Sequence, residues 1–429
     1  MQLAAKQLSA KEPQAALIAH AAKALAEALR FNGPADQVLS RHFREHRELG
    51  QRDREFVAES VFAVLRRMRS LEAACGGSRR PRDLVLAALV RLHGVSVRSL
   101  DGATSERERE LLGRAKAFAP ESAPPAVRAE LPDWLWKSLA EEFGAEDALA
   151  LARGMLDPAP MDLRVNALKA TRTEALERLR AAGLACEPTP YSPFGIRLAT
   201  KPQINRYPLY AQGVVEVQDE GSQLLACLVA PRRGEMVVDF CAGAGGKTLA
   251  LGAMMKNAGR LYAWEVSPKR LARLEPRLAR SGLSNVHPVA IASENDVRAR
   301  RLAGKIDRVL VDAPCSGFGT LRRNPDLKWR FSGKDVAELA AKQARILAGA
   351  SRLLKPGGRL VYATCSVLRE ECEAVAEAFL AAHPRFAVLS CAEILAAQRI
   401  ALDTGSALRL FTHRHRTDGF YAAVFTRAS

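Results

Sequence analysis

The sequence predicts a multidomain chain in which a helical domain and a small α+β domain precede an α/β domain that closes with an antiparallel hairpin. Three observations predict this architecture. Apolar residues recur at helical spacing in residues 1–120, short alternating strands flank one helix in residues 131–230, and strand-like runs alternate with helix-length stretches in residues 231–429. The 429 residues also fit two to four domains, since a domain takes roughly 100–200 residues.

The first predicted domain, residues 1–120, is expected to be entirely helical. In its clearest stretch, residues 56–68, apolar side chains occupy one helical face and charged side chains the other. Further stretches with this pattern cover residues 21–29, 38–44 and 84–92. Gly33-Pro34 and Gly76-Gly77 separate the helices, because such pairs favour turns.

The second predicted domain, residues 131–230, combines one helix with short strands. Thr171 followed by Glu174 is the capping-box pattern that begins a helix, and Gly183 is a typical helix end. Alternating apolar residues predict strands before and after that helix, over residues 163–167, 196–198 and 214–217. These elements indicate a small α+β domain.

The third predicted domain, residues 231–429, has the rhythm of a βαβ series. The expected strands cover residues 236–240, 260–265, 286–291, 308–313 and 359–365, and the expected helices cover residues 247–256, 268–280 and 334–354. Such a series forms a parallel sheet with helices on both faces. Residues 408–411 and 420–425, joined through Asp418-Gly419, are expected to close it as an antiparallel pair.

The charge of the chain indicates an anionic partner. It carries 64 Lys and Arg against 47 Asp and Glu, a net charge of +17, which most often serves nucleic-acid binding. The longest apolar run, residues 84–90, is far shorter than the roughly 20 residues of a membrane span. The eight cysteines include no CxxC pair, which argues against a disulfide framework or a zinc site. We therefore expect a cytoplasmic protein without membrane or metal.

A glycine-rich turn between the first strand and the first helix of the α/β domain predicts a nucleotide-like ligand. It runs through Cys241, Ala242, Gly243, Ala244, Gly245, Gly246 and Lys247. Gly246-Lys247-Thr248 matches the end of a phosphate-binding P-loop, but Cys241 stands where that motif needs its first glycine. An NTPase is therefore one alternative.

S-adenosylmethionine is the other ligand that this turn fits. Its ribose hydroxyls need an acid at the tip of the next strand, and Glu265 ends that strand about 20 residues past the glycines.

Two cysteines follow neighbouring strands at the edge where open α/β sheets bind ligands. One lies in Asp312-Ala313-Pro314-Cys315 and the other in Thr364-Cys365-Ser366. A thiolate that adds to carbon 6 of cytosine makes carbon 5 nucleophilic, so that carbon 5 can take a methyl group. Asp312 could protonate or hydrogen-bond the ring nitrogen, and Lys247 could favour the thiolate. These residues do not tell which cysteine attacks.

These segments resemble the signature segments of the Nop/Sun RNA (cytosine-5) methyltransferases, and the likeness is strongest to the bacterial branch that acts on 16S ribosomal RNA. The resemblance covers nearly the whole chain. It implies a NusB-like RNA-binding domain in residues 1–120, a small RNA-binding or linker domain in residues 131–230, and a Rossmann-like class I methyltransferase domain in residues 231–429. Asp418-Gly419-Phe420 matches the closing hairpin of the family.

The resemblance also implies roles for residues. Cys365 would be the nucleophile, Cys315 would assist product release, and Asp312 would contact the target base and the cofactor. The loop Cys241–Lys247 and Glu265 would hold S-adenosylmethionine. The family usually has Cys-Ala-Ala-Pro-Gly-Gly-Lys in this loop, so Gly243 and Ala244 depart from it. Glu294 stands in for an aspartate that the family places near the adenine.

The expected partner is RNA, ribosomal RNA in particular, with the target cytosine splayed out of its stack. Basic clusters that could contact its phosphates comprise Arg79, Arg80 and Arg82, then Arg232 and Arg233, then Arg298, Arg300 and Arg301, and finally Arg322, Arg323 and Lys328 with Trp329. We expect a monomer. Besides the NTPase, a non-catalytic RNA-binding factor on a methyltransferase fold is a second alternative.

Overall fold

The computed structural model describes residues 15–428, which fold into two compact units. The first unit comprises the chain up to Pro158 together with Thr320–Gly333, and the second comprises Ala159–Gly319 and Lys334 to the end. The predicted ranges differ from this division, because the helices after residue 120 and a segment from within the third range belong to the first unit. None of the helices among residues 15–428 is long and apolar enough to cross a membrane.

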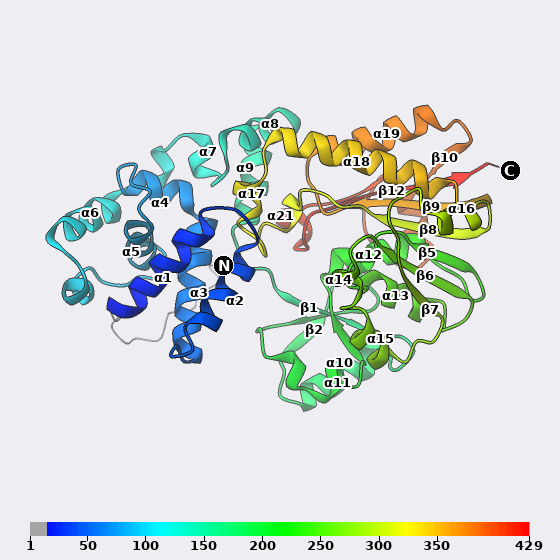
Figure 1. Ribbon diagram of the computed structural model, residues 1–429, viewed down its shortest axis with the longest axis horizontal. Helices are drawn as coiled ribbons and strands as arrows, with labels where there is room; N and C mark the ends of the chain where they lie inside the picture. The colour runs from blue at the N-terminus through cyan, green and yellow to red at the C-terminus, as the bar shows by residue number, and fades with distance from the viewer. Residues whose placement is uncertain (1–14, 429) are drawn as a thin grey trace. The chain divides into compact units, whose positions relative to one another are not determined.

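The first unit is helical, as its apolar spacing predicts (Figure 1). Its α-helices are α1 (Ala15–Ala28), α2 (Ala35–Glu45), α3 (Gln51–Arg66), α4 (Met68–Ala74), α5 (Pro81–Arg91), α6 (Glu106–Ala117), α7 (Pro125–Arg128), α8 (Asp133–Phe143), α9 (Ala145–Gly154) and α17 (Leu327–Arg330). Residues 84–90 of α5 are all buried, and α1, α3 and α6 pack around them. The longest apolar run of the chain therefore lies in the central helix of the core of the helical unit.

The segment Thr320–Gly333 leaves the second unit and packs into the first. The Lys328 ammonium donates to the Arg66 carbonyl at 2.9 Å, and the Trp329 indole donates to the Leu65 carbonyl at 2.7 Å. Arg322 and Lys328 are buried, with 5% and 2% of their surface exposed. This corrects the expectation that they contact RNA phosphates, because their side chains are inside the helical unit.

The second unit begins with a small antiparallel sheet in the order β2-β3-β1-β4. Its elements are β1 (Met161–Val165), α10 (Arg172–Ala181), β2 (Cys186–Pro188), β3 (Gly195–Leu198), α11 (Pro208–Ala211) and β4 (Val215–Val217). The predicted capping box is present: Thr171 Oγ1 accepts from the Glu174 amide and the Glu174 carboxylate accepts from the Thr171 amide. The helix packs on one face of this sheet through Ala175 and Leu179.

The large sheet follows, in the order β10-β12-β9-β8-β5-β6-β7, with β11 paired to β12. Its strands are β5 (Met236–Asp239), β6 (Arg260–Glu265), β7 (Val286–Ala290), β8 (Ile306–Asp312), β9 (Leu354–Thr364), β10 (Phe386–Leu389), β11 (Leu408–Leu410) and β12 (Phe420–Arg427). The strands β7, β6, β5, β8 and β9 are parallel, and β12 runs antiparallel to β9. The predicted parallel sheet and closing pair are both confirmed.

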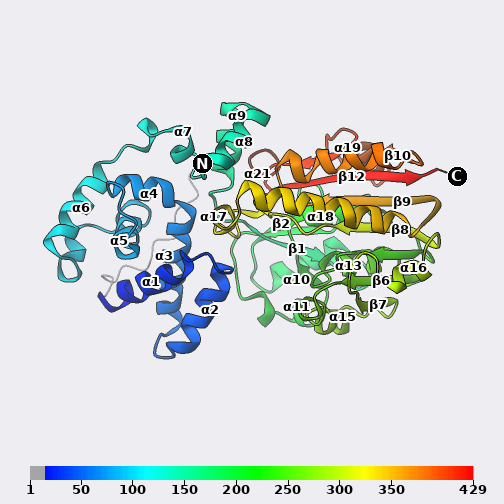
Figure 2. The same cartoon turned by 45° about the horizontal axis from the view of Figure 1, so that its top comes forward.

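Helices cover both faces of the large sheet, as Figures 1 and 2 show. Successive residues of a strand point to opposite faces, so Val237 joins the core under α12 and α13 while Val238 joins the core under α18 and α19. Besides α10 and α11, the α-helices of this unit are α12 (Glu220–Val229), α13 (Gly246–Met254), α14 (Pro268–Leu271), α15 (Glu275–Ser281), α16 (Val297–Arg301), α18 (Gly333–Ser351), α19 (Glu373–Ala382), α20 (Cys391–Ala396) and α21 (Thr412–His415).

Candidate active site

The strand order of the large sheet places a cavity at the carboxyl end of β5. The chain leaves β5 toward β6 on one side and later returns to β8 on the other, and ligands of open α/β sheets bind at such a reversal. The cavity has a volume of about 230 Å³. Its lining includes Cys241–Ala244, Gly246, Lys247, Asp239, Asp312, Gln218, Arg270 and Arg277.

The glycine-rich loop between β5 and α13 forms one wall of this cavity. Gly245 has φ of +80°, and a Cβ atom there would lie 2.1 Å from Leu274 Cδ1, so only glycine fits. Gly243 has φ of +57°, which the alanine usual in the family would adopt less easily. At its glycines, the loop therefore exposes its backbone to the cavity without intervening side chains. A nucleoside that carries an amino-acid group could bind there by close contact with that backbone.

Arginines from outside the loop hold its carbonyl groups. Arg277 of α15 donates to the Ala244 carbonyl at 2.7 Å and ion-pairs with Glu216 of β4. Arg164 of β1 donates to the Gly246 carbonyl at 2.6 Å and also to the Gln218 side chain. Burial lowers the pKa of Arg164 to about 10, which leaves it charged at neutral pH. Residues of the small sheet thus stabilise the conformation of the glycine-rich loop, through Arg164 directly and through the pairing of Glu216 with Arg277.

Asp239, the last residue of β5, lines the cavity with an unsatisfied oxygen. Its Oδ2 accepts from the Thr248 hydroxyl at 2.7 Å, whereas its buried Oδ1 has no hydrogen-bond partner among residues 15–428. Burial raises the pKa of Asp239 to about 7. A buried carboxylate oxygen without a donor fits the ammonium group of an amino-acid ligand.

Glu265 and Glu294 do not line the cavity. The Glu265 carboxylate accepts from the Gly243 and Ser267 amides, each at 2.9 Å, and its Oε2 lies 3.3 Å from Arg270 Nη1. It therefore supports the loop from behind. Glu294 contacts α18 instead, where its Oε1 lies 3.9 Å from Arg345 Nε. The structure does not bring Glu294 together with the other predicted residues.

Lys247 and Asp312 form an ion pair in the cavity wall, with Lys247 Nζ 2.6 Å from Asp312 Oδ2. Burial alone would lower the pKa of Lys247, but the Asp312 carboxylate outweighs it and raises that pKa. Cys365 also favours the charged ammonium. The positive charge of Lys247 and the Cys365 thiol are therefore near enough to interact electrostatically.

The two predicted cysteines meet beside this ion pair. Cys315 follows β8 and Cys365 follows β9, and their Sγ atoms are 3.3 Å apart as free thiols. The hydrogen bond with Cys365 and burial raise the pKa of Cys315 well above its usual value. Cys315 therefore keeps its proton at neutral pH, which makes it a thiol partner for Cys365.

A buried network that the sequence analysis missed holds the Cys315 loop. Glu371 is fully buried and accepts from the Ser316 amide at 2.8 Å and from the Ser316 hydroxyl at 2.5 Å. Gln343 of α18 donates to the Pro314 carbonyl and to Glu371, both at 3.0 Å. Glu371 comes six residues after Cys365 in an acidic stretch, so nothing in its local pattern singles it out.

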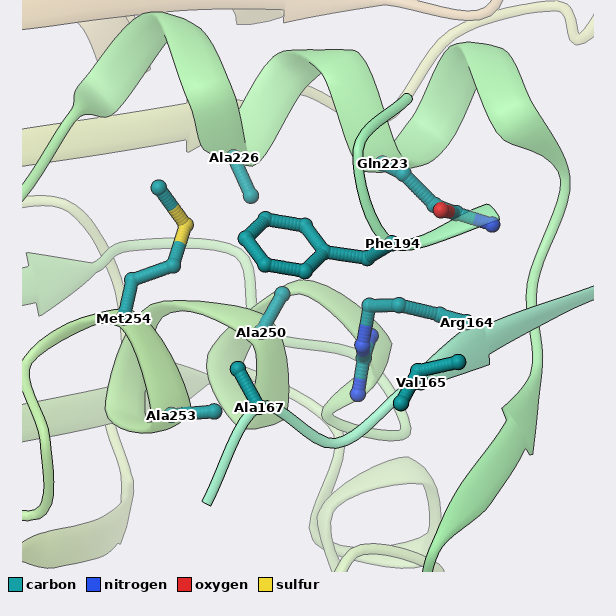
Figure 3. A pocket seen from close by; sticks show the side chains of 9 residues that line it. All are labelled: Arg164, Val165, Ala167, Phe194, Gln223, Ala226, Ala250, Ala253 and Met254. Atoms are coloured by element: carbon teal, nitrogen blue, oxygen red, sulfur yellow. The ribbon is translucent and has the colours of Figure 1, made fainter. Parts of the chain in front are cut away.

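A second cavity lies between the small sheet, α12 and α13, and Figure 3 shows the side chains around it. Phe194, Ala226, Ala250 and Met254 contribute apolar surface, and Arg164 and Gln223 lie at one side. Its volume of about 10 Å³ is barely that of one water molecule. It is therefore a packing gap rather than a ligand site.

Comparisons with known proteins agree with this geometry. The sequence profile of the family described as 16S rRNA methyltransferase RsmB/F matches residues 226–426. A second profile, the ferredoxin-like domain of RsmF/B-like methyltransferases, matches residues 131–205. The ribosomal RNA small subunit methyltransferase B of Sodalis glossinidius is 33% identical over 363 residues, which cover 78% of this chain and 83% of that protein.

Two solved structures from Pyrococcus horikoshii share the fold. A methyltransferase homologue is 28% identical in sequence to this chain and superposes with a TM-score of 0.62. The match covers 72% of this chain and 100% of that one. NSun6, solved with SFG, is 19% identical with a TM-score of 0.61, and the match covers 70% of this chain and 98% of that one.

Proposed function

Because the chain belongs to the 16S rRNA methyltransferase RsmB/F family, we propose that it methylates carbon 5 of a cytosine in 16S ribosomal RNA through a covalent bond to Cys365. The observation that carries this proposal is the pair of thiols, 3.3 Å apart, beside the Lys247–Asp312 ion pair. This arrangement supplies both a nucleophile and a group that assists its departure. The cytoplasm, where bacterial ribosomes are made and act, is the proposed location.

S-adenosylmethionine is the cofactor, and the residues of the cavity fit it. The Asp239 Oδ1 atom, which has no hydrogen-bond partner among residues 15–428, suits the ammonium group of the cofactor. The glycines of the loop Cys241–Gly246 let the amino-acid part of the cofactor approach the backbone closely. When bound, the cofactor would supply an electrophilic methyl group, and Asp312 is among the residues that line the cavity that would hold it. Glu265 supports the loop, and we propose that any contact of Glu294 with the adenine requires a rearrangement of the loop after β7.

The reaction begins with Cys365, whose sulfur forms a bond to carbon 6 of the cytosine. The ring electrons move toward carbon 5, and the Asp312 carboxyl contacts the polar edge of the base. After carbon 5 has taken its methyl group, the proton on carbon 5 leaves and the carbon–sulfur bond breaks, which restores the double bond. Cys315 assists this release, because its thiol gives its proton to the departing Cys365 sulfur and its own sulfur then takes up the proton from carbon 5. Both thiols are thereby restored, and the one proton released overall is the one that Cys365 lost to solvent before its attack.

The two alternatives have less support. An NTPase would use Lys247 on phosphates, but Lys247 is already paired with Asp312, and Cys241 replaces the first glycine of a P-loop. A non-catalytic RNA-binding factor has no need of two facing thiols. Binding of ATP–Mg²⁺ in place of S-adenosylmethionine would favour the first alternative, and RNA binding without methyl transfer would favour the second.

Replacing each cysteine in turn tests the proposed roles. We expect Cys365→Ala to abolish methyl transfer to 16S ribosomal RNA while cofactor binding persists, and Cys315→Ala to accumulate a covalent RNA–protein adduct. Cys186→Ser, a half-buried cysteine of the small sheet, is the matched control and should retain full activity. Labelled methyl incorporation and denaturing electrophoresis measure both effects. Two outcomes would overturn the assignment. One is methyl transfer by the Cys365→Ala variant, and the other is a Cys315→Ala variant that accumulates no covalent adduct.

A further inference from the structure

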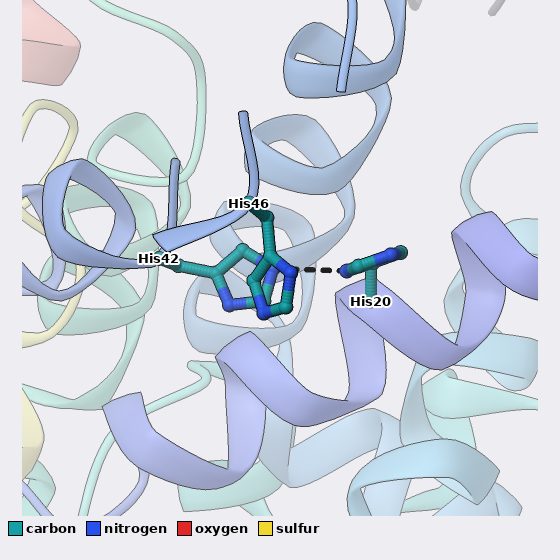
Figure 4. Close-up of side chains that lie close together, drawn as sticks. All are labelled: His20, His42 and His46. Atoms are coloured by element: carbon teal, nitrogen blue, oxygen red, sulfur yellow. Dashed lines mark hydrogen bonds between the residues drawn. The ribbon is translucent and has the colours of Figure 1, made fainter. Parts of the chain in front are cut away.

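Three histidines of the helical unit converge on one point, although the proposed reaction uses none of them. His20 lies on α1, His42 on α2, and His46 directly follows the end of α2 (Figure 4). One ring nitrogen from each lies within 4.8 Å of the others. His42 and His46 are four residues apart, a spacing that puts two ligands on one face of a helix.

The distances match the coordination sphere of a small transition-metal ion. His20 Nδ1 lies 3.3 Å from His42 Nε2. Two nitrogens at about 2.0–2.1 Å from a tetrahedral Zn²⁺ are themselves separated by about 3.3 Å. The ring nitrogens of the three histidines lie within 4.8 Å of one another, so the His46 ring must move closer by up to about 1.5 Å to complete the set. His42 is 5% exposed, so the site would lie at the edge of the core rather than on a loop tip.

Glu48 supplies the support that metal-binding histidines usually have. Its Oε1 lies 2.8 Å from His46 Nδ1 and 4.0 Å from His20 Nε2. A carboxylate that accepts from one ring nitrogen leaves the other nitrogen with its lone pair toward a metal. With His46 Nδ1 bonded to Glu48, the nitrogen that remains for a metal is His46 Nε2.

Lys23 is the competing group. Its ammonium lies 3.2 Å from His46 Nε2 and therefore occupies the lone pair that a metal would need. The side chain of Lys23 is exposed and can turn into solvent. A bound cation would also repel this ammonium, so its displacement is part of binding.

From this geometry we propose that His20, His42 and His46 bind a divalent transition-metal ion of the zinc class. Three neutral imidazoles suit Zn²⁺, Ni²⁺ or Cu²⁺, and a water molecule would complete the tetrahedron. The ion would fasten α1 to the end of α2 and so stabilise the helical unit. The proposal departs from the expectation, drawn from the absence of cysteine pairs, that the protein has no metal site.

Zinc titration of the tag-free, full-length protein tests the proposal. Because Cys315 and Cys365 could also take Zn²⁺, both are first replaced by Ser, and this double variant is the reference. We expect the reference to bind one equivalent of Zn²⁺ and to give the visible bands of tetrahedral Co²⁺. His46→Gln should weaken this binding by about a hundredfold or more, since ligand loss exceeds the 10–100-fold effect of losing a supporting group. His287→Gln, on β7, is the matched control and should change nothing.

Two further variants keep the test decisive if His46→Gln folds poorly. Glu48→Gln is at an exposed position and should weaken Zn²⁺ binding by about 10–100-fold. Lys23→Met should strengthen it, because the competing ammonium is gone. A reference protein without a tight Zn²⁺ site, or equal affinities in the reference, Glu48→Gln and Lys23→Met proteins, would overturn the proposal.

Discussion

Asp239 shows how one buried carboxyl can serve ligand binding at a cost to stability. Its pKa is raised to about 7 by burial, whereas an aspartate in an unfolded chain titrates near 3.8. The folded state therefore binds the proton more tightly than the unfolded state does. The contribution of Asp239 to stability is therefore most favourable below about pH 4, falls as the pH rises from about 4 to about 7, and carries the full penalty of the buried charge above that.

The substitution Asp239→Asn separates the two effects. Above pH 7 we expect the variant to be more stable than the wild type, by on the order of 1 kcal/mol, because no buried charge remains. Its affinity for S-adenosylmethionine should fall tenfold or more, since an amide cannot pair with the ammonium. Wild-type affinity should weaken as the pH drops below about 7, while the variant shows no such change. Calorimetric titrations at several pH values measure this, and equal pH profiles would show that Asp239 does not contact the ligand.

Glu371 positions the Cys315 loop without touching the reacting atoms. It accepts two hydrogen bonds from Ser316, so Glu371→Gln should lose one of them and let Cys315 move away from Cys365. We expect methyl transfer to fall about tenfold or more while cofactor affinity is unchanged, and the unfolding free energy to drop by about 1–3 kcal/mol. Glu370→Gln, the exposed neighbour, is the control. A parallel loss of cofactor affinity would contradict a role confined to this loop.

Local motifs identified Cys315, Cys365, Asp312 and Lys247 because each sits at a strand end or in a glycine-rich turn, and these features are visible in the sequence. The roles of Asp239 and Glu371 depend on burial and on partners far along the chain, such as Gln343. Glu294 shows the converse, because its place after a strand suggested a ligand contact and its side chain lies against α18.

Among the elements, the loop between β5 and α13 has the strictest requirement. Gly245→Ala would place a Cβ atom 2.1 Å from Leu274 Cδ1 at a φ of +80°. Gly234→Ala has a similar φ of +87° but meets no atom within 4 Å, so it reports the backbone strain alone.

We expect Gly234→Ala to cost about 1 kcal/mol of unfolding free energy, the usual strain of a left-handed alanine. Gly245→Ala should cost about 1–3 kcal/mol more, because the added methyl group overpacks against Leu274. It should also weaken cofactor binding at least tenfold, whereas Gly234→Ala should leave that binding intact. Urea denaturation and cofactor titration give the comparison, and equal losses in both variants would exclude the contact with Leu274 as the cause.

The parallel strands were predictable because strands covered on both faces are continuous apolar runs. The edge strand β10 was not, because two of its four residues are exposed and the strand is short, with its pairing partner β12 beyond α20, β11 and α21 in the chain. The helix α12 also escaped prediction. All of its residues are buried, including the polar Glu220, Ser222 and Gln223, so it presents no solvent-exposed polar face of the kind that marks surface helices.

At the scale of the whole molecule, the helical unit is assembled from two separate parts of the chain. The segment Thr320–Gly333 begins directly after Gly319, whose amide donates to the Cys365 carbonyl at 2.9 Å. The segment Thr320–Gly333, which directly follows the loop that carries Cys315, thus belongs to the helical unit. Sequence patterning could not show this, because the contacts join residues more than 200 positions apart, such as Lys328 and Arg66.

The net charge of +17 predicted an anionic partner, but it did not show which basic residues are free to contact one. Arg232, Arg233, Arg298, Arg300 and Arg301 are exposed, whereas Arg322 and Lys328 are buried. Composition therefore predicts a class of partner, and burial decides which cations are accessible to it.

Lys328 and Glu130 are buried, oppositely charged groups of the helical unit, and each attracts the other electrostatically. Burial lowers the pKa of Lys328 to about 7, and burial raises the pKa of Glu130, while each group's charge favours the charged form of the other. Glu130 also accepts from the Ser70 amide at 3.2 Å, so the pair links α17 to α4. Removal of one of these two charges leaves the other buried without an opposite charge near it, which destabilises the folded state.

We expect Glu130→Gln and Lys328→Met each to lower the unfolding free energy of the protein by about 3–5 kcal/mol, whereas the double variant should lose less than the sum of the two. The reason is that the double variant removes the uncompensated charge together with its partner. Lys334→Met with Glu338→Gln, an exposed pair on α18, provides the control cycle and should show a coupling below about 1 kcal/mol. Urea unfolding of the four proteins in each cycle gives both coupling energies. Additive losses at Glu130 and Lys328 would mean that the inserted segment is held by its apolar contacts alone.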